Sequence, residues 1–211
     1  GFCLVGSEMC IRDRFTSGSA PMTEQTHSLF IERTGHRILE RYGMTEAGII
    51  ASNPLTGDRI PGSVGFALPG VDMRVRDGMQ ICKSGEIGVV EVSGDHVFSG
   101  YWRKENETSQ AFSDDGFLVT GDIGVIDSDG RLRLKGRSTD LIISGGENIY
   151  PREIERHLDD VDCIRESAVI GISDEDLGEA VVAVIAPNGS FNESEVRDYI
   201  KDKVANFKRP R

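Results

Sequence analysis

The sequence lacks long apolar runs and an excess of positive charge. Its 211 residues carry 24 Lys and Arg against 35 Asp and Glu, which gives a formal net charge of −11. That balance disfavours nucleic acid or an anionic membrane surface as a partner, because both repel a negatively charged protein. The longest purely aliphatic stretch, 180–186, is far shorter than the ~20 residues that a membrane-spanning helix needs. We therefore expect no integral membrane segment and no nucleic-acid partner.

Closely spaced cysteines are lacking as well. Cys3, Cys10, Cys82 and Cys163 lie far apart and form no C-x-x-C pair, which indicates neither a zinc site nor a disulfide framework. The start of the chain has no basic flank before an apolar segment, so no secretory signal is predicted and a reducing cytoplasm is the expected location. Glycine, by contrast, is abundant at 25 residues. This is well above the ~7% average and predicts many turns or backbone surfaces that approach a ligand closely.

Both ends of the sequence differ from ordinary domain ends. Residues 9–14 read MCIRDR, which resembles the translated end of a transposon adaptor used in sequencing libraries. We therefore expect residues 1–14 to be a non-native extension and leave them out of the fold prediction. Residues 207–211 stop directly after a predicted helix, without a turn signal or a closing strand. The chain is accordingly expected to be an internal fragment of a longer protein.

Hydrophobic spacing in the first part of the chain indicates an α/β layer. Residues 15–21 are predicted as a strand and a turn of small residues, 23–34 as a helix that stops at a glycine, and 37–42 as a second strand. From about residue 60 the pattern changes to a mostly antiparallel β region. A hairpin turn is expected at 127–130, where Asp-Ser-Asp-Gly separates two apolar stretches.

A second, smaller α+β unit is predicted after Arg137. One helix begins at Pro151, because proline suits the first helical turn. Another begins at a capping box formed by Asn192 and Glu195 and extends to Phe207. Strands are expected at 140–144, 168–172 and 180–186. The predicted fold class is therefore α/β plus α+β.

Two segments of the first part could bind a ligand. Residues 18–20 are small and follow a strand, which lets a flat ligand lie against the backbone, although such a cluster also makes an ordinary tight turn. In 41–46 (RYGMTE), Tyr42 can stack on an aromatic base, Thr45 offers a hydroxyl to a phosphate, and Glu46 can hold Mg²⁺. The same six residues are also compatible with a loop that exposes an aromatic side chain.

Further candidates lie in the β region and after it. Asp122 carries an acceptor-only carboxylate that could take two vicinal ribose hydroxyls, or it is a turn residue. Arg137 could anchor a phosphate, and the glycine pair 145–146 could leave room for a narrow chain, unless this segment is an ordinary linker and glycine turn. The four histidines, His27 among them, are expected at the surface, and Trp102 is expected to be a packing residue.

Taken in order, these segments resemble the acyl-adenylate-forming family, which includes acyl-CoA synthetases, luciferases and the adenylation domains of peptide synthetases. The resemblance rests on SGSAP, RYGMTE, GYW, GFLVTGD, GRSTDLIISGGENIYPREIE and NFKRPR, and it covers essentially residues 15–211. It implies that 15–138 form the end of a large AMP-binding domain with its β-rich subdomain. Residues 139–211 would form a small, mobile and incomplete C-terminal domain.

The resemblance implies an acid–thiol ligase that uses ATP, Mg²⁺ and coenzyme A. A carboxylate attacks the α-phosphate of ATP to give an acyl-AMP and pyrophosphate, and the CoA thiol then displaces AMP. By resemblance, Thr45 and Glu46 would be catalytic, with Glu46 as the Mg²⁺ ligand. The residues that would contact the nucleotide or CoA are Gly18, Ser19, Ala20, Tyr42, Gly43, Met44, Thr45, Asp122, Arg137, Gly145 and Gly146.

Within this family, the runs GHRILERYGMTE and SNPLTGDRIPGSVGFALPGV most resemble malonyl-CoA synthetases. Met44 would form a wall of the acyl pocket. Arg41 is a candidate for binding the distal carboxylate of a short diacid, because a guanidinium pairs bidentately with a carboxylate. Arg41 is also compatible with a surface or ion-paired strand residue. The stretch after Glu46, AGIIASNP, is more apolar than we expect of bacterial malonate enzymes, so methylmalonate or another short acid is an alternative substrate.

The chain departs from the complete family pattern at three places. The hinge position is Thr139, where the family usually has Asp or Lys. The phosphate-binding loop is expected before Phe15 and the catalytic lysine after Arg211, so the 211 residues alone are expected not to form acyl-adenylate at a useful rate. Two rival functions are an adenylation domain that loads a carrier protein and a non-catalytic interaction module.

Overall fold

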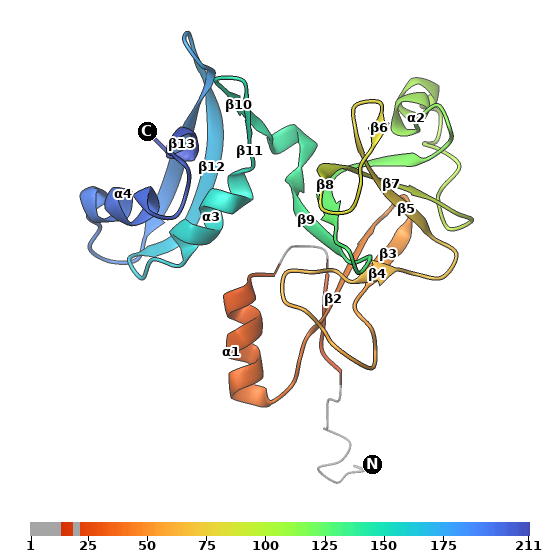
Figure 1. Cartoon of the computed structure of the whole chain (residues 1–211), viewed down its shortest axis with the longest axis horizontal. Coiled ribbons are helices and arrows are strands. Elements are labelled where there is room, and N and C mark those ends of the chain that lie inside the picture. The colour runs from red at the N-terminus through yellow and green to blue at the C-terminus, as the bar shows by residue number, and fades with distance from the viewer. Residues whose placement is uncertain (1–13, 19–21) are drawn as a thin grey trace. The chain divides into compact units, whose positions relative to one another are not determined.

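Two compact units make up the computed structural model (Figure 1). The structure describes residues 14–18 and 22–211, so most of the expected N-terminal extension, together with Ser19 and Ala20, lies outside the described residues. The N-terminal unit contains the residues up to 120 and 124–134, and the C-terminal unit contains 121–123 and 135–211. Both units mix helices and strands, which confirms the predicted fold class.

Helix α1 (Glu24–Thr34) connects the first two strands of the N-terminal unit and has the expected caps. The Thr23 hydroxyl oxygen accepts a hydrogen bond from the Thr26 amide at 3.1 Å. At the other end, Gly35 has a left-handed conformation, with a φ of 71°, and donates its N–H back into the last turn at 2.8 Å. The helix predicted at 23–34 is therefore confirmed, since both caps satisfy backbone groups that a helix leaves unpaired.

A four-stranded sheet carries the first candidate segments. Its order is β1-β2-β3-β4, with the bounds Thr16–Ser17, Leu39–Met44, Gly48–Ser52 and Phe66–Ala67. β1 runs parallel to β2, whereas β2–β3 and β3–β4 are antiparallel. The strand predicted at 37–42 thus begins two residues later and continues to Met44, because pairing with β3 extends β2 into the segment that was expected to be a loop.

The β-rich region forms a five-stranded sheet of order β6-β5-β7-β8-β9. Its strands are β5 (Asp72–Asp77), β6 (Gln80–Ile81), β7 (Ile87–Ser93), β8 (Leu118–Ile126) and β9 (Leu132–Arg137), and the short helix α2 (Glu105–Ala111) precedes β8. The β5–β6 and β5–β7 pairs are antiparallel, as predicted. The predicted hairpin turn is closed by Asp127, whose Oδ1 accepts the N–H groups of Asp129 and Arg131 at 3.1 and 2.9 Å.

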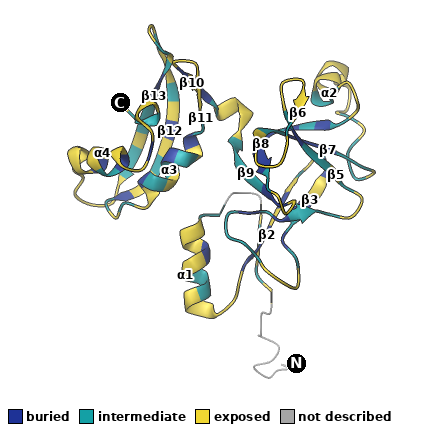
Figure 2. Ribbon diagram, in the orientation of Figure 1, coloured by how far each residue is buried: buried dark blue, intermediate teal, exposed yellow. Residues whose placement is uncertain are grey.

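Apolar side chains of both sheets form the core of the N-terminal unit. Figure 2 colours the buried residues along the ribbon dark blue. Ile50, Val90 and Leu132 have no exposed surface. Burial of such side chains is the main favourable contribution to folding. Tyr42 belongs to the same core and Met44 packs against it. The core therefore fixes the strand that carries the candidate residues.

In the C-terminal unit, a 3-10 turn at Ser138–Asp140 leads into a sheet covered by helices. The sheet order is β11-β10-β13-β12, with the bounds Glu147–Ile149, Ile142–Ser144, Gly178–Pro187 and Ile164–Asp174. Helix α3 (Pro151–Asp159) starts at the predicted proline, and helix α4 (Glu193–Lys201) is capped by the predicted asparagine, Asn192.

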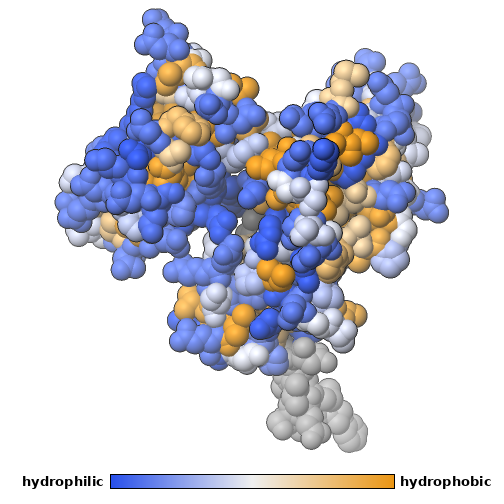
Figure 3. All heavy atoms as spheres, viewed as in Figure 1, coloured by the Kyte–Doolittle hydropathy of each residue, from blue (hydrophilic) through white to orange (hydrophobic). Residues whose placement is uncertain are grey.

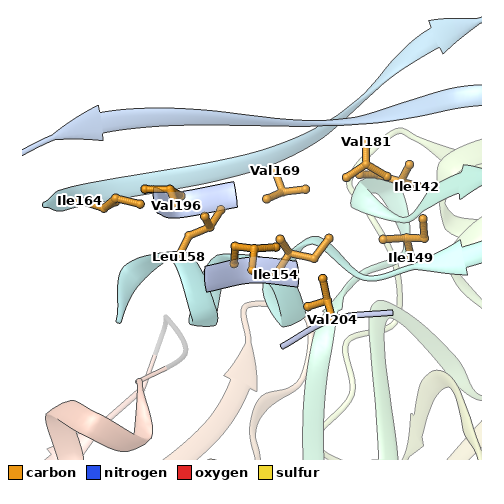
Figure 4. Packing of buried hydrophobic residues seen from close by; sticks show 10 residues of the cluster. Ile142, Ile149, Ile154, Leu158, Ile164, Val169, Val181, Val196 and Val204 are labelled. Carbon is orange, nitrogen blue, oxygen red and sulfur yellow. The ribbon is translucent and has the colours of Figure 1, made fainter. Parts of the chain in front are cut away.

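The core of the C-terminal unit joins these helices to the sheet (Figure 4). Ile154 and Leu158 of α3 and Val196 of α4 meet Val169 and Val181 of the two long strands. All five side chains are buried. Because these residues come from elements far apart in the sequence, the cluster holds the unit together as one folded body.

The last predicted helix is shorter than expected. α4 ends at Lys201, and Phe207, expected on the same helix, is 46% exposed in a separate 3-10 turn at Asn206–Lys208. The Arg209 guanidinium donates to the carbonyl oxygens of Lys201 and Val204 at 2.6 and 3.4 Å. A side chain therefore satisfies the carbonyl groups that a further helical turn would have used.

Hydrophilic side chains dominate the face that Figure 3 shows, and apolar atoms gather in smaller groups among them. This agrees with a charged content of 28%. Within the described ranges, no helix is both long enough and apolar enough to cross a membrane.

Candidate functional site

The hairpin of β2 and β3 presents the RYGMTE segment. Tyr42 pairs with Ala51 and Gly43 pairs with Ile49, so Ile50 is an extra residue on β3 and forms a β-bulge. Ile50 points into the core and has no exposed surface. A bulge bends the strand and redirects its side chains. The β-bulge at Ile50 therefore helps to set the direction in which the side chains of the RYGMTE segment point.

Gly43 lies where the neighbouring strand leaves no room for a side chain. A Cβ atom there would lie 2.2 Å from the carbonyl oxygen of Gly48 and 2.9 Å from the Cα of Ile49. Both are backbone atoms, so a side-chain rotation cannot relieve the contact. Gly43 thus has a steric role in the hairpin, and its predicted close approach to a ligand stays a prediction.

Arg41 and Gly18 lie next to each other. β1 pairs Ser17 with Glu40, and a Cβ atom on Gly18 would lie 3.3 Å from the Cγ of Arg41. Both Gly18 and Arg41 are exposed. Among the residues that the structure describes, no carboxylate lies within 4.0 Å of the Arg41 guanidinium.

The turn after Met44 carries Thr45, which is exposed, and Glu46, which is half-buried. The hydroxyl of Tyr101 donates a hydrogen bond to the Oε1 of Glu46 at 2.8 Å. The Phe98 N–H donates to the backbone carbonyl of Glu46 at 2.7 Å. The hydrogen bond to Glu46 is also the main reason why the pKa of Tyr101 is raised, because it favours the neutral phenol.

The Glu46 carboxylate fits the predicted metal role. Its Oε2 has no hydrogen bond or ion pair to the described residues. Among all the residues that the structure describes, no group of three or more His, Cys, Asp or Glu side chains could hold a metal ion. Mg²⁺ commonly binds through one or two carboxylates together with substrate phosphates. A single carboxylate, directly after Thr45 in the sequence, is therefore compatible with a metal that arrives with a nucleotide.

Asp122 and Arg137 form an ion pair in the C-terminal unit. The Nε of Arg137 lies 2.9 Å from the Oδ1 of Asp122, and the two side chains are 54% and 11% exposed. Asp122 lies inside β8 and not in a turn, so the alternative turn role is wrong. Asp122 is buried but the Arg137 side chain is open to solvent, so the pair contributes less to stability than a fully enclosed one. It does, however, orient the carboxylate.

The predicted hinge and the glycine pair also lie in the C-terminal unit. Thr139 lies in the 3-10 turn that follows β9. Gly145 and Gly146 form the two-residue turn between β10 and β11, with φ values of 59° and 83°. Two consecutive positive φ angles are typical of a tight β-hairpin turn. A cavity of about 240 Å³ beside this turn is lined by Ser144, Gly145, Glu147, Leu177, Val181, Asn206, Phe207, Arg209 and Arg211.

Two family models match the chain. The model of the AMP-binding enzyme matches residues 9–102, and the model of the AMP-binding enzyme C-terminal domain matches residues 153–211. The chain belongs to the AMP-binding enzyme family. The resemblance predicted from the motifs is thereby confirmed.

Similar members of this family include CoA ligases. The mitochondrial malonate–CoA ligase ACSF3 of Mus musculus is 37% identical over 92% of this chain and 37% of its own length. The long-chain-fatty-acid–CoA ligase of Bacillus subtilis is 36% identical over 92% of this chain and 36% of its own length. The structure of ATP-bound MatB from Rhodopseudomonas palustris has a TM-score of 0.90 at 47% identity, over 94% of this chain and 40% of that one. The chain thus spans well under half the length of these ligases.

One buried polar pair in this AMP-binding enzyme chain was not predicted. His27, expected at the surface, is 1% exposed, and its Nδ1 lies 3.3 Å from the Oε1 of Glu40. Glu40 is 5% exposed and directly precedes Arg41, and its Oε1 also accepts the Gly62 N–H at 3.3 Å. The expectation for His27 was wrong because α1 turns this polar side chain toward β2, and no local pattern marks that contact.

The GYW motif of this family member was also misjudged. Trp102, expected to pack, is 84% exposed. Its neighbour Tyr101 makes the specific contact, with Glu46, from 55 positions along the chain. Only the motif itself could have pointed to Tyr101, because hydropathy and spacing carry no signal for a contact over that separation.

Replacing Glu40 with glutamine is expected to change the pH dependence of folding. Burial raises the pKa of Glu40 above its ordinary value of 4.5, so the folded chain holds this proton more tightly than the unfolded chain. That contribution to stability is complete below the unfolded-state pKa and is lost as the pH rises through the folded-state pKa. Glutamine stays neutral, so Glu40→Gln should lose less stability than the parent as the pH rises from 4.5 toward neutrality.

Urea unfolding of both proteins at a series of pH values measures this difference. Glu32→Gln, at an exposed position of α1, is the matched control and should keep the parent's pH slope. Equal slopes for Glu40→Gln and the parent would contradict the expected role of burial.

Proposed function

We propose that the chain is part of an ATP-dependent acyl-CoA synthetase, which converts a carboxylate, ATP and coenzyme A into acyl-CoA, AMP and pyrophosphate. Similarity to CoA ligases over more than nine-tenths of the chain carries this proposal. Malonate or a related short acid is the proposed substrate, because malonate–CoA ligases are among the similar proteins. The spacing of the cysteines supports a cytoplasmic location.

In the N-terminal unit, the proposed nucleotide contacts come from residues 18–20, from β2 and from the turn that follows β2. Tyr42 is proposed to stack on adenine, and Gly18, Ser19 and Ala20 are proposed to line the adenine and acyl pocket. Thr45 donates its hydroxyl to a phosphate oxygen, which its exposed position supports. Glu46 would hold Mg²⁺, which when bound neutralises phosphate oxygens and so favours attack at the α-phosphate.

The proposed acyl site uses Arg41 and Met44. The guanidinium of Arg41 is exposed and has no carboxylate partner among the described residues. It can therefore pair bidentately with the distal carboxylate of a diacid. Met44 is half-buried against the core, which supports its role as an apolar wall for a short acyl chain.

In the C-terminal unit, Asp122 is proposed to accept the two ribose hydroxyls, with Arg137 also near the nucleotide. Gly145 and Gly146 would border the path of the pantetheine arm. We propose residue 138 as the end of the AMP-binding domain and Thr139 as the pivot of the small domain at 139–211. The short 3-10 turn at Ser138–Asp140 supports a change of chain direction at this point.

The test replaces Asp122 and measures AMP binding to the chain by calorimetry. A lost hydrogen bond to a charged group is worth about 1.5–3 kcal/mol, so Asp122→Ala, which removes two such bonds, should weaken AMP binding by at least roughly 10- to 100-fold. Asp122→Asn keeps the shape of the side chain but removes its charge, and it should also weaken AMP binding. Asp129→Ala, at an exposed position of the following hairpin turn, is the matched control. An unchanged affinity would favour a non-catalytic interaction module.

A second assay identifies the acyl acceptor in the complete ligase. With malonate, ATP and coenzyme A, the expected product is a free CoA thioester together with AMP and pyrophosphate. Transfer of the acyl group only to a phosphopantetheine carrier domain would instead favour an adenylation domain of the carrier-loading type.

A further inference from the structure

We propose that Tyr101 is a positioning residue for the Glu46 carboxylate, an inference that rests on the proposed function. Its hydroxyl donates to the Oε1 of Glu46 at 2.8 Å. The other carboxylate oxygen, Oε2, has no described partner. One oxygen is thus fixed by the protein while the second stays available to a ligand.

The segment that carries Tyr101 is fixed by a contact between two aromatic rings and by backbone hydrogen bonds. The Tyr101 ring meets the Phe98 ring edge-on, with the centroids 4.8 Å apart and an angle of 71° between the planes. The Tyr101 N–H donates to the Oγ1 of Thr108 at 2.9 Å. Phe98 in turn donates its N–H to the backbone carbonyl of Glu46 at 2.7 Å. Two separate hydrogen bonds therefore join this segment to Glu46.

Gly100 allows Tyr101 to take this position. Its φ is 144°, and a Cβ atom there would lie 2.6 Å from the Cγ2 of Thr108. A side chain at this position would push the segment away from α2, the helix that carries Thr108. Gly100 of the GYW motif thus avoids a steric clash with Thr108. Tyr101, which follows it, donates a hydrogen bond to the Glu46 carboxylate.

A phenol is well suited to this task because it is a neutral donor. A lysine or arginine beside Glu46 would form an ion pair and compete with a bound cation. The Tyr101 hydroxyl adds no positive charge and still restricts the torsions of the Glu46 side chain, whose freedom a ligand would otherwise have to remove. Mg²⁺ demands near-ideal octahedral geometry, so a pre-oriented carboxylate oxygen should bind it more tightly.

The experiment measures metal binding directly in the complete ligase. Mn²⁺ is the probe, with α,β-methylene-ATP as a nucleotide that cannot transfer its adenylyl group, and free Mn²⁺ is followed by electron paramagnetic resonance. Tyr101→Phe is expected to weaken Mn²⁺ binding roughly tenfold, because the ligand must then restrict the freed Glu46 side chain itself. Thermal unfolding of Tyr101→Phe checks that the fold is kept.

A double-mutant cycle separates positioning from a general structural effect. In a Glu46→Gln background, Tyr101→Phe should cause no further loss of Mn²⁺ binding, because the oriented charge is already absent. Tyr199→Phe, at a half-buried tyrosine of α4, is the matched control and should bind Mn²⁺ like the parent.

The outcomes distinguish this inference from the proposed function. If Glu46→Gln loses Mn²⁺ binding but Tyr101→Phe binds like the parent, the positioning role is overturned and the metal role of Glu46 stands. A tenfold loss that persists in the Glu46→Gln background would also overturn it. If Glu46→Gln itself binds Mn²⁺ like the parent, the metal assignment fails, and the inference fails with it.

Discussion

Under the proposed function, acyl-adenylate formation is expected to fall roughly 10²- to 10³-fold when Glu46 is replaced by glutamine in the complete protein. Glutamine has the shape of glutamate, and its amide oxygen can still accept the hydrogen bond that Tyr101 donates to Oε1. The substitution therefore removes a negative charge while the local packing is kept. The effect should be confined to the step in which phosphate charge develops.

Two half-reactions measured separately test this confinement. ATP–pyrophosphate exchange reports acyl-adenylate formation and should show the full loss. Thioester formation from supplied acyl-AMP and coenzyme A should change less than about threefold, because it involves no pyrophosphate leaving group. Glu105→Gln, at an exposed glutamate of α2, is the control and should leave both rates unchanged. Parent-like exchange in Glu46→Gln would contradict the role of this carboxylate.

The second large effect is expected for Gly43→Ala. Its new Cβ atom would lie 2.2 Å from the Gly48 carbonyl oxygen, and that oxygen belongs to the paired strand. β2 and β3 must separate to relieve the overlap, which disturbs the bulge at Ile50 and the core position of Tyr42. Overpacking of this kind costs roughly 3 kcal/mol of folding free energy. The proposed nucleotide binding through Tyr42 should be lost together with stability.

Gly48→Asn is the matched variant in the same hairpin. Gly48 has a φ of 59° and no atom within 4 Å of a Cβ position. Asparagine tolerates this left-handed conformation, so the cost should be roughly 1 kcal/mol or less. Urea unfolding followed by circular dichroism compares the two variants. Equal stabilities would mean that the strands at Gly43 separate without cost and that the bulge is not fixed.

The sequence predicted well those structural features that depend on residues close together in the chain. Thr23 and Gly35 mark the two ends of α1, and Pro151 marks the start of α3. The hairpin turn after β8 is held by Asp127 and the backbone that follows it. In each case the chemical signal and the backbone group that it satisfies lie within about one turn of each other. Such signals need no knowledge of the tertiary structure.

The features that escaped prediction depend on contacts between distant segments. Tyr101 reaches Glu46 over 55 positions, and His27 reaches Glu40 over 13. Helix α4 ends early because Arg209, eight positions after Lys201, takes the carbonyl of that residue. The motifs could suggest which residue types belong to the site, but they carried no information on which side chain holds another in place.

Helix α1 has an unusual attachment to its sheet, since His27 is its buried residue and the ring of Phe30 meets Phe15 at 4.9 Å. Detaching the helix therefore uncovers little aliphatic surface, and its amides should exchange with deuterium through local opening, well before those of β3 or β7. His27 touches Glu40, the residue before Arg41. A ligand that immobilises the end of β2 should consequently slow amide exchange in a helix that it never touches.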